Sequence, residues 1–155
     1  SFYGDDEKEV LQQFLKLADQ FAPRKKALFF AGHNIREFDV PYICRRTLVH
    51  QLMLPPVLQL HGLRPWEVRM VDTLHLWRFG DIKHYTSLKL LAAVLDVPTP
   101  KDDIDGSMVG TTYWQEHDLP RIAVYCQKDV ITVAQLLLRF KGISLLPQEN
   151  IEMVN

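Results

Sequence analysis

The sequence predicts an α/β fold, because short apolar runs alternate with segments of helical spacing. Residues 27–31 form an apolar run bounded by basic residues and Gly32, which is typical of a buried strand. Residues 67–71 are predicted to form a second strand, and several helices follow it. The chain has 155 residues, the size of one domain, so we expect a single domain over residues 1–155.

The first half of the chain is predicted to contain two long helices. Asp6-x-x-Glu9 resembles a capping box at the start of the first helix. Apolar residues then recur at helical spacing, namely Val10, Leu11, Phe14, Leu15, Leu17, Ala18 and Phe21. Pro23 should end this helix. A second helix is expected over 39–53, and a short helical turn over 72–77.

The second half is predicted to be helical. Thr86 should cap a helix over 88–95, and another helix is expected over 106–115. Asp118 should cap the last helix, over 119–141, which Gly142 follows. Its predicted core stripe consists of Ile122, Val130, Val133, Ala134, Leu137 and Phe140.

Two short parallel strands make a small sheet, since sheets usually have about four to six strands. The run 27–31 is also too apolar to be left as an open edge. We therefore expect the complete fold to have further strands N-terminal to Ser1, so that this chain is a truncated domain.

Composition narrows the class of function. The net charge of −1 argues against a protein that holds duplex DNA by electrostatics alone, and Arg45-Arg46 is interpreted as a solvated face. No apolar run reaches about 18 residues, so we expect no membrane partner. Cys44 and Cys126 form no ligand pattern, which favours buried thiols and a cytoplasmic location. The sequence leaves the oligomeric state open.

A first candidate motif follows the first predicted strand. Asn34 and Asp39 come directly after the run 27–31, and the carboxyl end of a strand is where ligands bind in α/β sheets. Asp39 also stands at a helix start, where exposed N–H groups stabilise a carboxylate. The alternative interpretations are that Asp39 only caps its helix and that Asn34 only stabilises its own turn.

A second candidate motif lies on the last helix. Tyr125 and Asp129 are four residues apart, so they share a face. A carboxylate and a phenol on an otherwise apolar helix suggest a metal ligand with a hydrogen-bonding partner. Mg²⁺ and Mn²⁺ prefer oxygen ligands, and phosphodiester hydrolysis typically uses two such ions about 4 Å apart. Alternatively, Asp129 pairs with Lys128 or a neighbouring helix, and Tyr125 is a core tyrosine.

These two motifs resemble a known family. Asn-x-x-x-Phe-Asp at 34–39, followed by Tyr-x-x-x-Asp at 125–129, resembles the second and third exonuclease motifs of the DEDD (DnaQ-like) superfamily, in its tyrosine subclass. The residues within these motifs are especially similar to those in the proofreading domains of family B DNA polymerases. Asp72-Thr73, residues 85–90 and Asp105-Gly106-Ser107 also look like that group, so the resemblance covers about residues 2–141.

The resemblance implies a ribonuclease-H-like fold and a 3′→5′ exonuclease that uses two Mg²⁺ or Mn²⁺ ions on the 3′ end of single-stranded DNA. It implies that Asp129 is a direct ligand of one ion and that Asp39 helps hold the other. Tyr125 would orient the attacking water. Phe38 would pack near the terminal nucleotide, where it could equally be a core residue, and Asn34 would contact the sugar–phosphate.

One part of the family pattern is missing. The first motif, Asp-x-Glu on a first strand, is not found: Asp5-x-Glu7 lies at a helix start and Asp103-x-Asp105 in a loop. We therefore expect the chain alone to bind metal weakly and to hydrolyse little or nothing. The alternatives are a non-catalytic nucleic-acid-binding or scaffold module and an exoribonuclease. The six histidines, His33 included, show no metal-binding spacing and are interpreted as structural or exposed.

Overall fold

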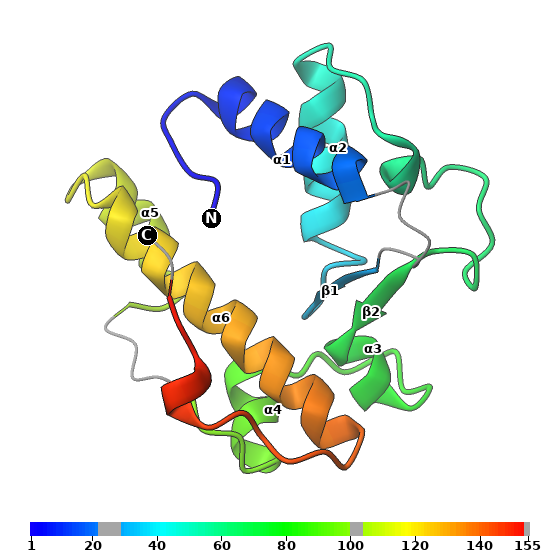
Figure 1. The fold of residues 1–155 in the computed structure, drawn as a ribbon, viewed down its shortest axis with the longest axis vertical. Coiled ribbons are helices and arrows are strands. Elements are labelled where there is room, and N and C mark those ends of the chain that lie inside the picture. The colour runs from blue at the N-terminus through cyan, green and yellow to red at the C-terminus, as the bar shows by residue number, and fades with distance from the viewer. Residues whose placement is uncertain (22–28, 100–103, 154–155) are drawn as a thin grey trace. The chain divides into compact units, whose positions relative to one another are not determined.

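A computed structural model describes residues 1–21, 29–99 and 104–153. Helices and a small parallel sheet make up these residues, which confirms the α/β prediction (Figure 1). The elements in order are α1 (Glu7–Phe21), β1 (Phe30–Gly32), α2 (Asp39–Val49), the 3₁₀ helix η1 (Pro56–Leu58), β2 (Met70–Asp72), α3 (Thr73–Arg78), α4 (Leu88–Val94), α5 (Val109–Trp114), α6 (Leu119–Phe140) and the 3₁₀ helix η2 (Gln148–Asn150).

The chain divides into two compact units. The first unit is Phe2–Leu76, and the second is Trp77–Asn155 together with Ser1. The first contains α1, α2 and both strands, and the second contains α4, α5 and α6. That residues 1–155 form a single domain stays a prediction.

The sheet consists of β1 and β2, which pair in parallel with Phe30 opposite Met70 and Gly32 opposite Asp72. Both strands begin three residues later than predicted. Residues 27 and 28 lie outside the described residues, Phe29 is 54% exposed and Ala31 is exposed, so the prediction of a buried first strand is wrong.

Part of the late start of β2 has a local cause, a turn that includes Glu67. Arg64 and Glu67 close a turn on each other: the backbone N–H of Arg64 donates to Glu67 Oε2 at 2.7 Å, and the N–H of Glu67 donates to Arg64 O at 2.9 Å. Residues 64–67 are therefore used in the turn and cannot join the strand.

Helix α1 begins as predicted. The Asp6 side chain accepts a hydrogen bond from the backbone N–H of Glu9 at 3.1 Å, which is half of a capping box. Its buried residues are Leu11, Leu15 and Ala18, and Leu17 is 39% exposed. Pro23, predicted to end the helix, lies outside the described residues.

The first unit has its own apolar core. Its buried members are Leu15 of α1, Val40 of α2, Leu58 of η1 and Met70 of β2. These four residues come from four different elements, so the core holds both helices against the sheet.

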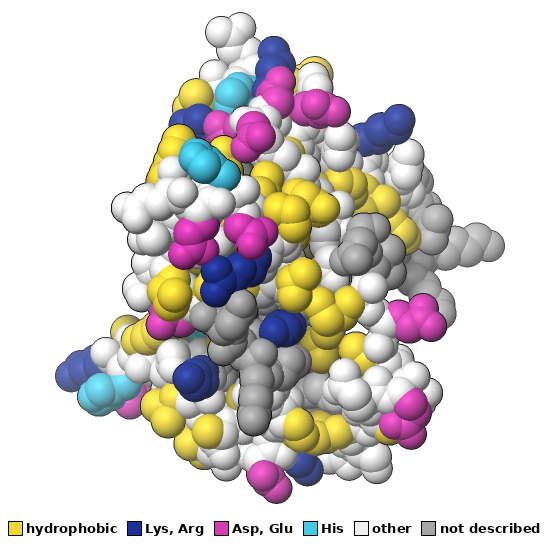
Figure 2. Space-filling model, turned by 90° about the vertical axis from the view of Figure 1, so that its left-hand side faces the viewer, with side chains coloured by type: hydrophobic (Ala, Val, Ile, Leu, Met, Phe, Trp, Pro, Cys, Tyr) yellow, Lys and Arg dark blue, Asp and Glu magenta, His cyan; other side chains and the backbone are white. Residues whose placement is uncertain are grey.

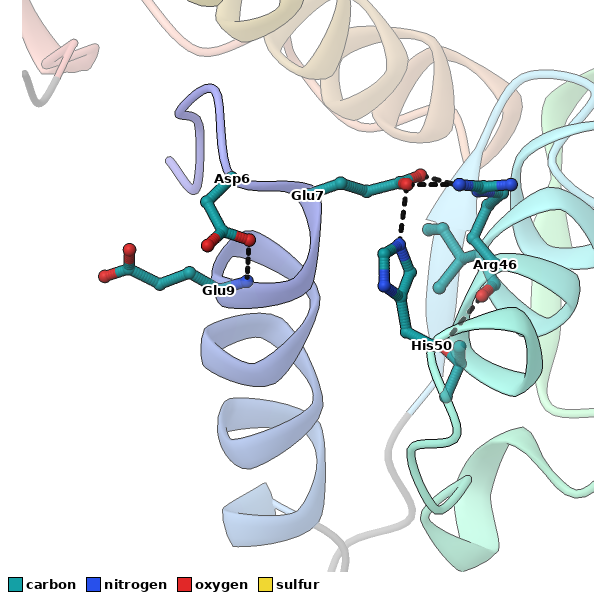
Figure 3. Close-up of polar contacts among 7 residues, drawn as sticks. Asp6, Glu7, Glu9, Arg46 and His50 are labelled. Atoms are coloured by element: carbon teal, nitrogen blue, oxygen red, sulfur yellow. Dashed lines mark hydrogen bonds and ion pairs between the residues drawn. The ribbon is translucent and has the colours of Figure 1, made fainter.

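A charged network also joins α1 to α2 (Figure 3). The Arg46 guanidinium donates from Nε to Glu7 Oε1 at 2.7 Å and from Nη2 to Glu7 Oε2 at 2.5 Å, and His50 Nε2 lies 2.8 Å from Oε2. Arg45 is exposed and the Arg46 side chain is 34% exposed, so this ion pair lies on a solvated face. The hydrogen bonds from Arg46 and His50 lower the pKa of Glu7 to about 2.

Helix α2 ends at Val49, four residues earlier than predicted. Gln51 has a φ of 56°, and the N–H of Leu52 donates back to Thr47 O at 3.0 Å. This closing turn stops the helix, and it leaves Met53 88% exposed.

In the second unit α6 packs against α4 and α5, over a core that includes Leu91, Ala92, Val97 and Leu136. The prediction of the cap on α6 is confirmed, since the Asp118 side chain accepts from the N–H of Arg121 at 3.1 Å. The cap on α4 was predicted wrongly: the side chain that accepts, from Leu90 N–H at 3.2 Å, is Ser87 rather than Thr86. Helix α5 starts at Val109, since a turn with Met108 N–H on Asp105 O precedes it.

The buried face of α6 also differs from the predicted stripe. Val130 is 68% exposed and Ala134 is exposed, and the buried residues are Ala123, Thr132, Val133, Gln135 and Leu136. Cys126 is exposed and Cys44 half-buried, so the prediction of two buried thiols is wrong.

Gln135 explains why a polar residue is buried in α6. Its side chain donates to Leu146 O at 2.8 Å and accepts from Leu146 N–H at 2.9 Å. The amide thus completes the backbone pairing of Leu146 and ties the C-terminal segment to α6. Across the described residues, no helix combines the length and apolar character needed to cross a membrane.

We predict that Glu7→Gln lowers the melting temperature at pH 6 by about 2–5 °C, since a solvent-screened ion pair contributes modestly. The pKa of Glu7 falls from 4.5 to about 2 on folding, so its contribution is present above pH 4.5 and is lost as the pH falls towards 2. Thermal unfolding at pH 6 and pH 3 should therefore show a smaller difference from wild type at pH 3. Glu9→Gln, in the same helix, is the control and should have the smaller effect at pH 6. An equal Glu7→Gln effect at both pH values would contradict the role of the network.

We predict that Gly32→Ala destabilises the first unit by about 1–3 kcal/mol. A Cβ at residue 32 would lie 2.1 Å from Ile35 Cγ2, and a β-branched side chain has little freedom to move. Urea unfolding measures the loss. Gly110→Ala in α5 is the control, because a Cβ there meets nothing within 4 Å, and it should leave stability unchanged or raise it. Equal stability of the two variants would contradict the close approach at Gly32.

Candidate active site

The loop after β1 carries the first candidate motif at the carboxyl ends of the two strands. Asn34 has a φ of 63°, a left-handed conformation that asparagine tolerates better than most residues. Its carbonyl accepts from the N–H of Glu37 at 3.3 Å and of Phe38 at 3.0 Å. The chain then enters α2 at Asp39, so Asn34 and Asp39 lie at the two ends of one short turn.

Asp72 is the residue against which this loop is built. It is the last residue of β2, and it is 2% exposed. Its Oδ1 accepts from the backbone N–H of Asn34 at 2.8 Å and of Leu74 at 3.0 Å, and its Oδ2 accepts from Arg36 N–H at 3.1 Å. Sequence reasoning gave Asp72 no role. The signal that it could have used is an acid at the end of an apolar strand, since a buried carboxylate requires donors.

Asp39 is the first residue of α2 and is exposed. Phe38 is the cap residue, and the cap position makes no side-chain hydrogen bond. The surrounding protein removes part of the water from the Asp39 carboxyl group, and this desolvation raises its pKa. A backbone hydrogen bond at Asp39 opposes the rise, and the negative charge of Asp72 adds to it. An electrostatic environment of this kind favours a proton or a cation beside Asp39.

Other acids in the described part of the chain show the opposite effect. The pKa of Asp105 is lowered by hydrogen bonds from Ser107, and that of Asp81 is lowered by His84. The pKa of Glu7 is lowered by hydrogen bonds from Arg46 and His50, as described above. These three acids are stabilised as carboxylates by donors of the protein, whereas the environment of Asp39 destabilises its negative charge.

Phe38 lies at the surface. Its side chain is 65% exposed, and Tyr42, one turn further along α2, is 55% exposed. The alternative that Phe38 is a core residue is therefore wrong. Figure 2 shows one face of the molecule, on which hydrophobic side chains lie at the surface among acidic and basic ones.

His33 is fixed at the strand end by Thr73. The Thr73 hydroxyl donates to Gly32 O at 3.2 Å, which uses its single proton. His33 Nδ1 lies 2.9 Å from the same hydroxyl oxygen. The interpretation of His33 as a structural residue thus gains a specific partner, Thr73.

The second candidate motif lies on α6. Tyr125 and Asp129 are half-buried and share a face, whereas Cys126 and Val130 are exposed. A Cβ built on Gly106 would lie 3.9 Å from the Tyr125 hydroxyl, so this phenol is next to the Asp105-Gly106-Ser107 turn.

Asp105 makes that turn. Its Oδ1 accepts from the N–H of Ser107 at 2.8 Å and from the Ser107 hydroxyl at 2.6 Å. Asp105 is therefore a turn residue.

The predicted site residues are shared between the two units. Asn34, Phe38 and Asp39 belong to the first unit, and Tyr125 and Asp129 belong to the second. Asp39 and Asp129 supply carboxylate oxygens, the donors that Mg²⁺ prefers, so they fit such an ion in chemical kind. No group of three or more His, Cys, Asp or Glu side chains able to hold a metal occurs among the described residues.

Comparison with known proteins gives one match. No curated protein and no solved structure matches the chain. A family model described as a predicted 3′-5′ exonuclease related to the exonuclease domain of PolB matches residues 3–149. Because this match runs over nearly the whole sequence, the chain belongs to the family of predicted 3′-5′ exonucleases related to the exonuclease domain of PolB.

Proposed function

We propose that this protein is a metal-dependent 3′→5′ exonuclease that removes nucleoside 5′-monophosphates from the 3′ end of single-stranded DNA. Membership in the exonuclease family over residues 3–149 carries the proposal. The motif loop supports it, because Asn34 and Asp39 follow a strand at the carboxyl end of a parallel sheet, where α/β proteins bind ligands. We also propose the ribonuclease-H-like fold, the tyrosine subclass of the DEDD superfamily and a cytoplasmic location.

In this proposal Asp39 and Asp129 hold Mg²⁺ or Mn²⁺, two ions in the complete domain. When bound, such ions activate water and stabilise the negative charge of the leaving oxygen. The raised pKa of Asp39 supports its assignment, since a cation relieves the cost of its charge. These two acids are half of the four carboxylates that the resemblance implies, so we expect weak metal binding and slow turnover from residues 1–155 alone.

Three other side chains would act on the substrate. The Tyr125 hydroxyl would hold the attacking water by a hydrogen bond. Asn34 would bind the sugar–phosphate, and its Oδ1 is buried and has no hydrogen-bond partner among the described residues. Phe38, exposed at the start of α2, would pack against the terminal nucleotide.

Single-stranded DNA is the proposed substrate, because local stacking and metal contacts can hold a strand without a strongly basic surface. The net charge of −1 is consistent with such a local mode. An exoribonuclease is the alternative within the same chemistry, and parallel assays on DNA and RNA oligonucleotides of one sequence distinguish the two.

The second candidate function is a non-catalytic nucleic-acid-binding or scaffold module of the same fold. The observation that favours it is that the Asp-x-Glu motif of the resemblance is not found in this sequence. This module would bind a single strand with the same affinity in EDTA and in Mn²⁺, and it would release no nucleotide from it.

We predict that Asp129→Asn in the full-length protein lowers kcat by several orders of magnitude and leaves the melting temperature nearly unchanged, because the amide is a poor ligand for a hard divalent ion. Nucleotide release from a single-stranded DNA oligonucleotide in Mn²⁺ is the measurement. Asp96→Asn, at an exposed acid in the same unit, is the matched control and should keep wild-type kcat. Near-normal turnover by Asp129→Asn would remove Asp129 from the site.

We predict that Phe38→Ala raises KM for the DNA oligonucleotide by about tenfold, because stacking on one base contributes about 1–3 kcal/mol. Stability should change little, since the ring is 65% exposed. Met53→Ala removes another exposed apolar side chain of the first unit and serves as the control, with unchanged KM. Equal KM values for Phe38→Ala and wild type would argue against a substrate contact.

A further inference from the structure

The Asp72 carboxylate makes bonds that few buried acids make. Asn34 and Arg36, whose backbone N–H groups it accepts, lie 38 and 36 residues earlier in the chain. Its third donor, the N–H of Leu74, lies in α3, the helix that directly follows β2. One side chain at the end of a strand therefore fixes two positions of the motif loop, and three donors offset the cost of burying its charge.

Arg36 makes the reverse connection, from the loop to β2. Its Nη2 lies 3.2 Å from Met70 O and 3.4 Å from Val68 O, to which it donates. The intervening carbonyl, that of Arg69, accepts from Phe30 N–H. Since carbonyl groups alternate in direction along a strand, Arg36 covers the edge of β2 that faces away from β1. The loop is thus held to β2 through both its backbone and its side chain.

Two neighbouring buried residues at the junction of β2 and α3 bond over a long range, since Asp72 accepts from the loop N–H groups and the Thr73 hydroxyl donates to Gly32 O. Thr47 and Thr132 instead bond locally. Thr47 is fully buried, and its hydroxyl donates to Ile43 O within α2. Thr132 is also buried, and it donates to Lys128 O within α6. These hydroxyls satisfy their own helices, whereas Asp72 connects elements that are far apart in sequence. An apolar side chain could fill the volume of Asp72, but it could not hold the N–H groups of the loop.

The position of the loop determines where its functional side chains lie. Asn34 accepts from Phe38 N–H, and Ile35 O accepts from Val40 N–H at 3.0 Å, so the turn continues without a break into α2. Moving the N–H of Asn34 or Arg36 would therefore move the start of α2. Asp39 is the first residue of that helix and would move with it.

We propose that Asp72 is a positioning residue of the nuclease site: it holds the loop that carries Asn34 and Asp39 in the geometry that the reaction needs. The Arg36 side chain holds the same loop to β2 by donating to carbonyl groups of that segment. This inference rests on the proposed exonuclease function. Asp72 acts through the loop backbone, and it touches neither substrate nor metal in this assignment.

The test is Asp72→Asn in the full-length protein. Asparagine keeps the shape of aspartate but replaces one acceptor oxygen by an N–H₂ donor, so at least one of the three backbone N–H groups loses its acceptor. We expect kcat on a single-stranded DNA oligonucleotide in Mn²⁺ to fall about 10- to 100-fold, the usual cost of losing a supporting partner, with KM changed about twofold at most. Amide hydrogen exchange at Asn34 and Arg36 should become at least about tenfold faster.

Thr47→Val is the matched control, because it removes a buried polar group of the same unit that bonds within its own helix. Assayed well below the melting temperature of each variant, it should keep kcat within about twofold of wild type, and the loop amides should keep their protection. A general loss of stability would affect both variants alike, so a fall in kcat common to both would overturn the inference.

Arg36→Met tests the inference if Asp72→Asn does not fold. It removes the guanidinium donors and keeps a long side chain, so we expect faster exchange at the loop amides and a smaller fall in kcat. An active wild-type protein whose variants at Asp72 and Arg36 keep its kcat, or keep its loop protection, overturns the inference and leaves the exonuclease proposal intact. A full-length wild-type protein that releases no nucleotide in Mn²⁺ or Mg²⁺ overturns the exonuclease proposal, and the inference with it.

Discussion

The register that sets Gly32 opposite Asp72 is the constraint on which the first unit depends. The sheet ends at this pair, where β1 contributes a residue without a side chain and β2 contributes a charged residue. Gly32 has no side chain, which lets Ile35 approach its backbone closely. Asp72 has a charged one, which collects the N–H groups of the departing loop. A shift of the register by one residue would remove both conditions at once.

Polar side chains connect distant segments of this chain, which supplements its small sheet. Three residue pairs join β1 to β2, so both strands are shorter than the usual length of about five or six residues in globular proteins. Bonds between distant segments supplement the sheet: Glu7 with Arg46 joins α1 to α2, and in the second unit Gln135 pairs with Leu146. Each of these side chains satisfies groups that water would otherwise have to solvate, so they define geometry as well as adding stability.

Local features were predictable from the sequence to the extent that their causes are local. The caps Asp6 and Asp118 each satisfy an N–H three residues away, and both were predicted correctly. The cap on α4 was assigned to Thr86 instead of Ser87 because two neighbouring hydroxyls offer the same chemistry, and the sequence does not distinguish them. The stripe on α6 was wrong because periodicity counts Val130 as apolar but cannot detect that Gln135 has a backbone partner eleven residues away.

The candidate site residues divide in the same way, into those with a local sequence signal and those whose contacts lie far away in the sequence. Asn34, Phe38, Asp39, Tyr125 and Asp129 were identified from motif spacing, which records the chemistry that a residue type can perform. Asp72 was named only as part of the resemblance and was given no role, because its bonds reach residues 34 and 36, and no pattern within a short window contains both ends. The exposure of Phe38 likewise depends on the side of α2 that faces the core, where Val40 is buried.

The acids with shifted pKa values differ in whether hydrogen-bond donors of the protein surround them. Glu7 and Asp105 meet donors of the protein, which lower their pKa values and make them stable as carboxylates without any ligand. The pKa of Asp39 is raised instead, because desolvation and the charge of Asp72 outweigh a backbone hydrogen bond at Asp39. The Asp72 carboxylate, by contrast, accepts hydrogen bonds from three backbone N–H groups. The two carboxylates thus differ in their donors, and the environment of Asp39 favours a proton or a cation beside it.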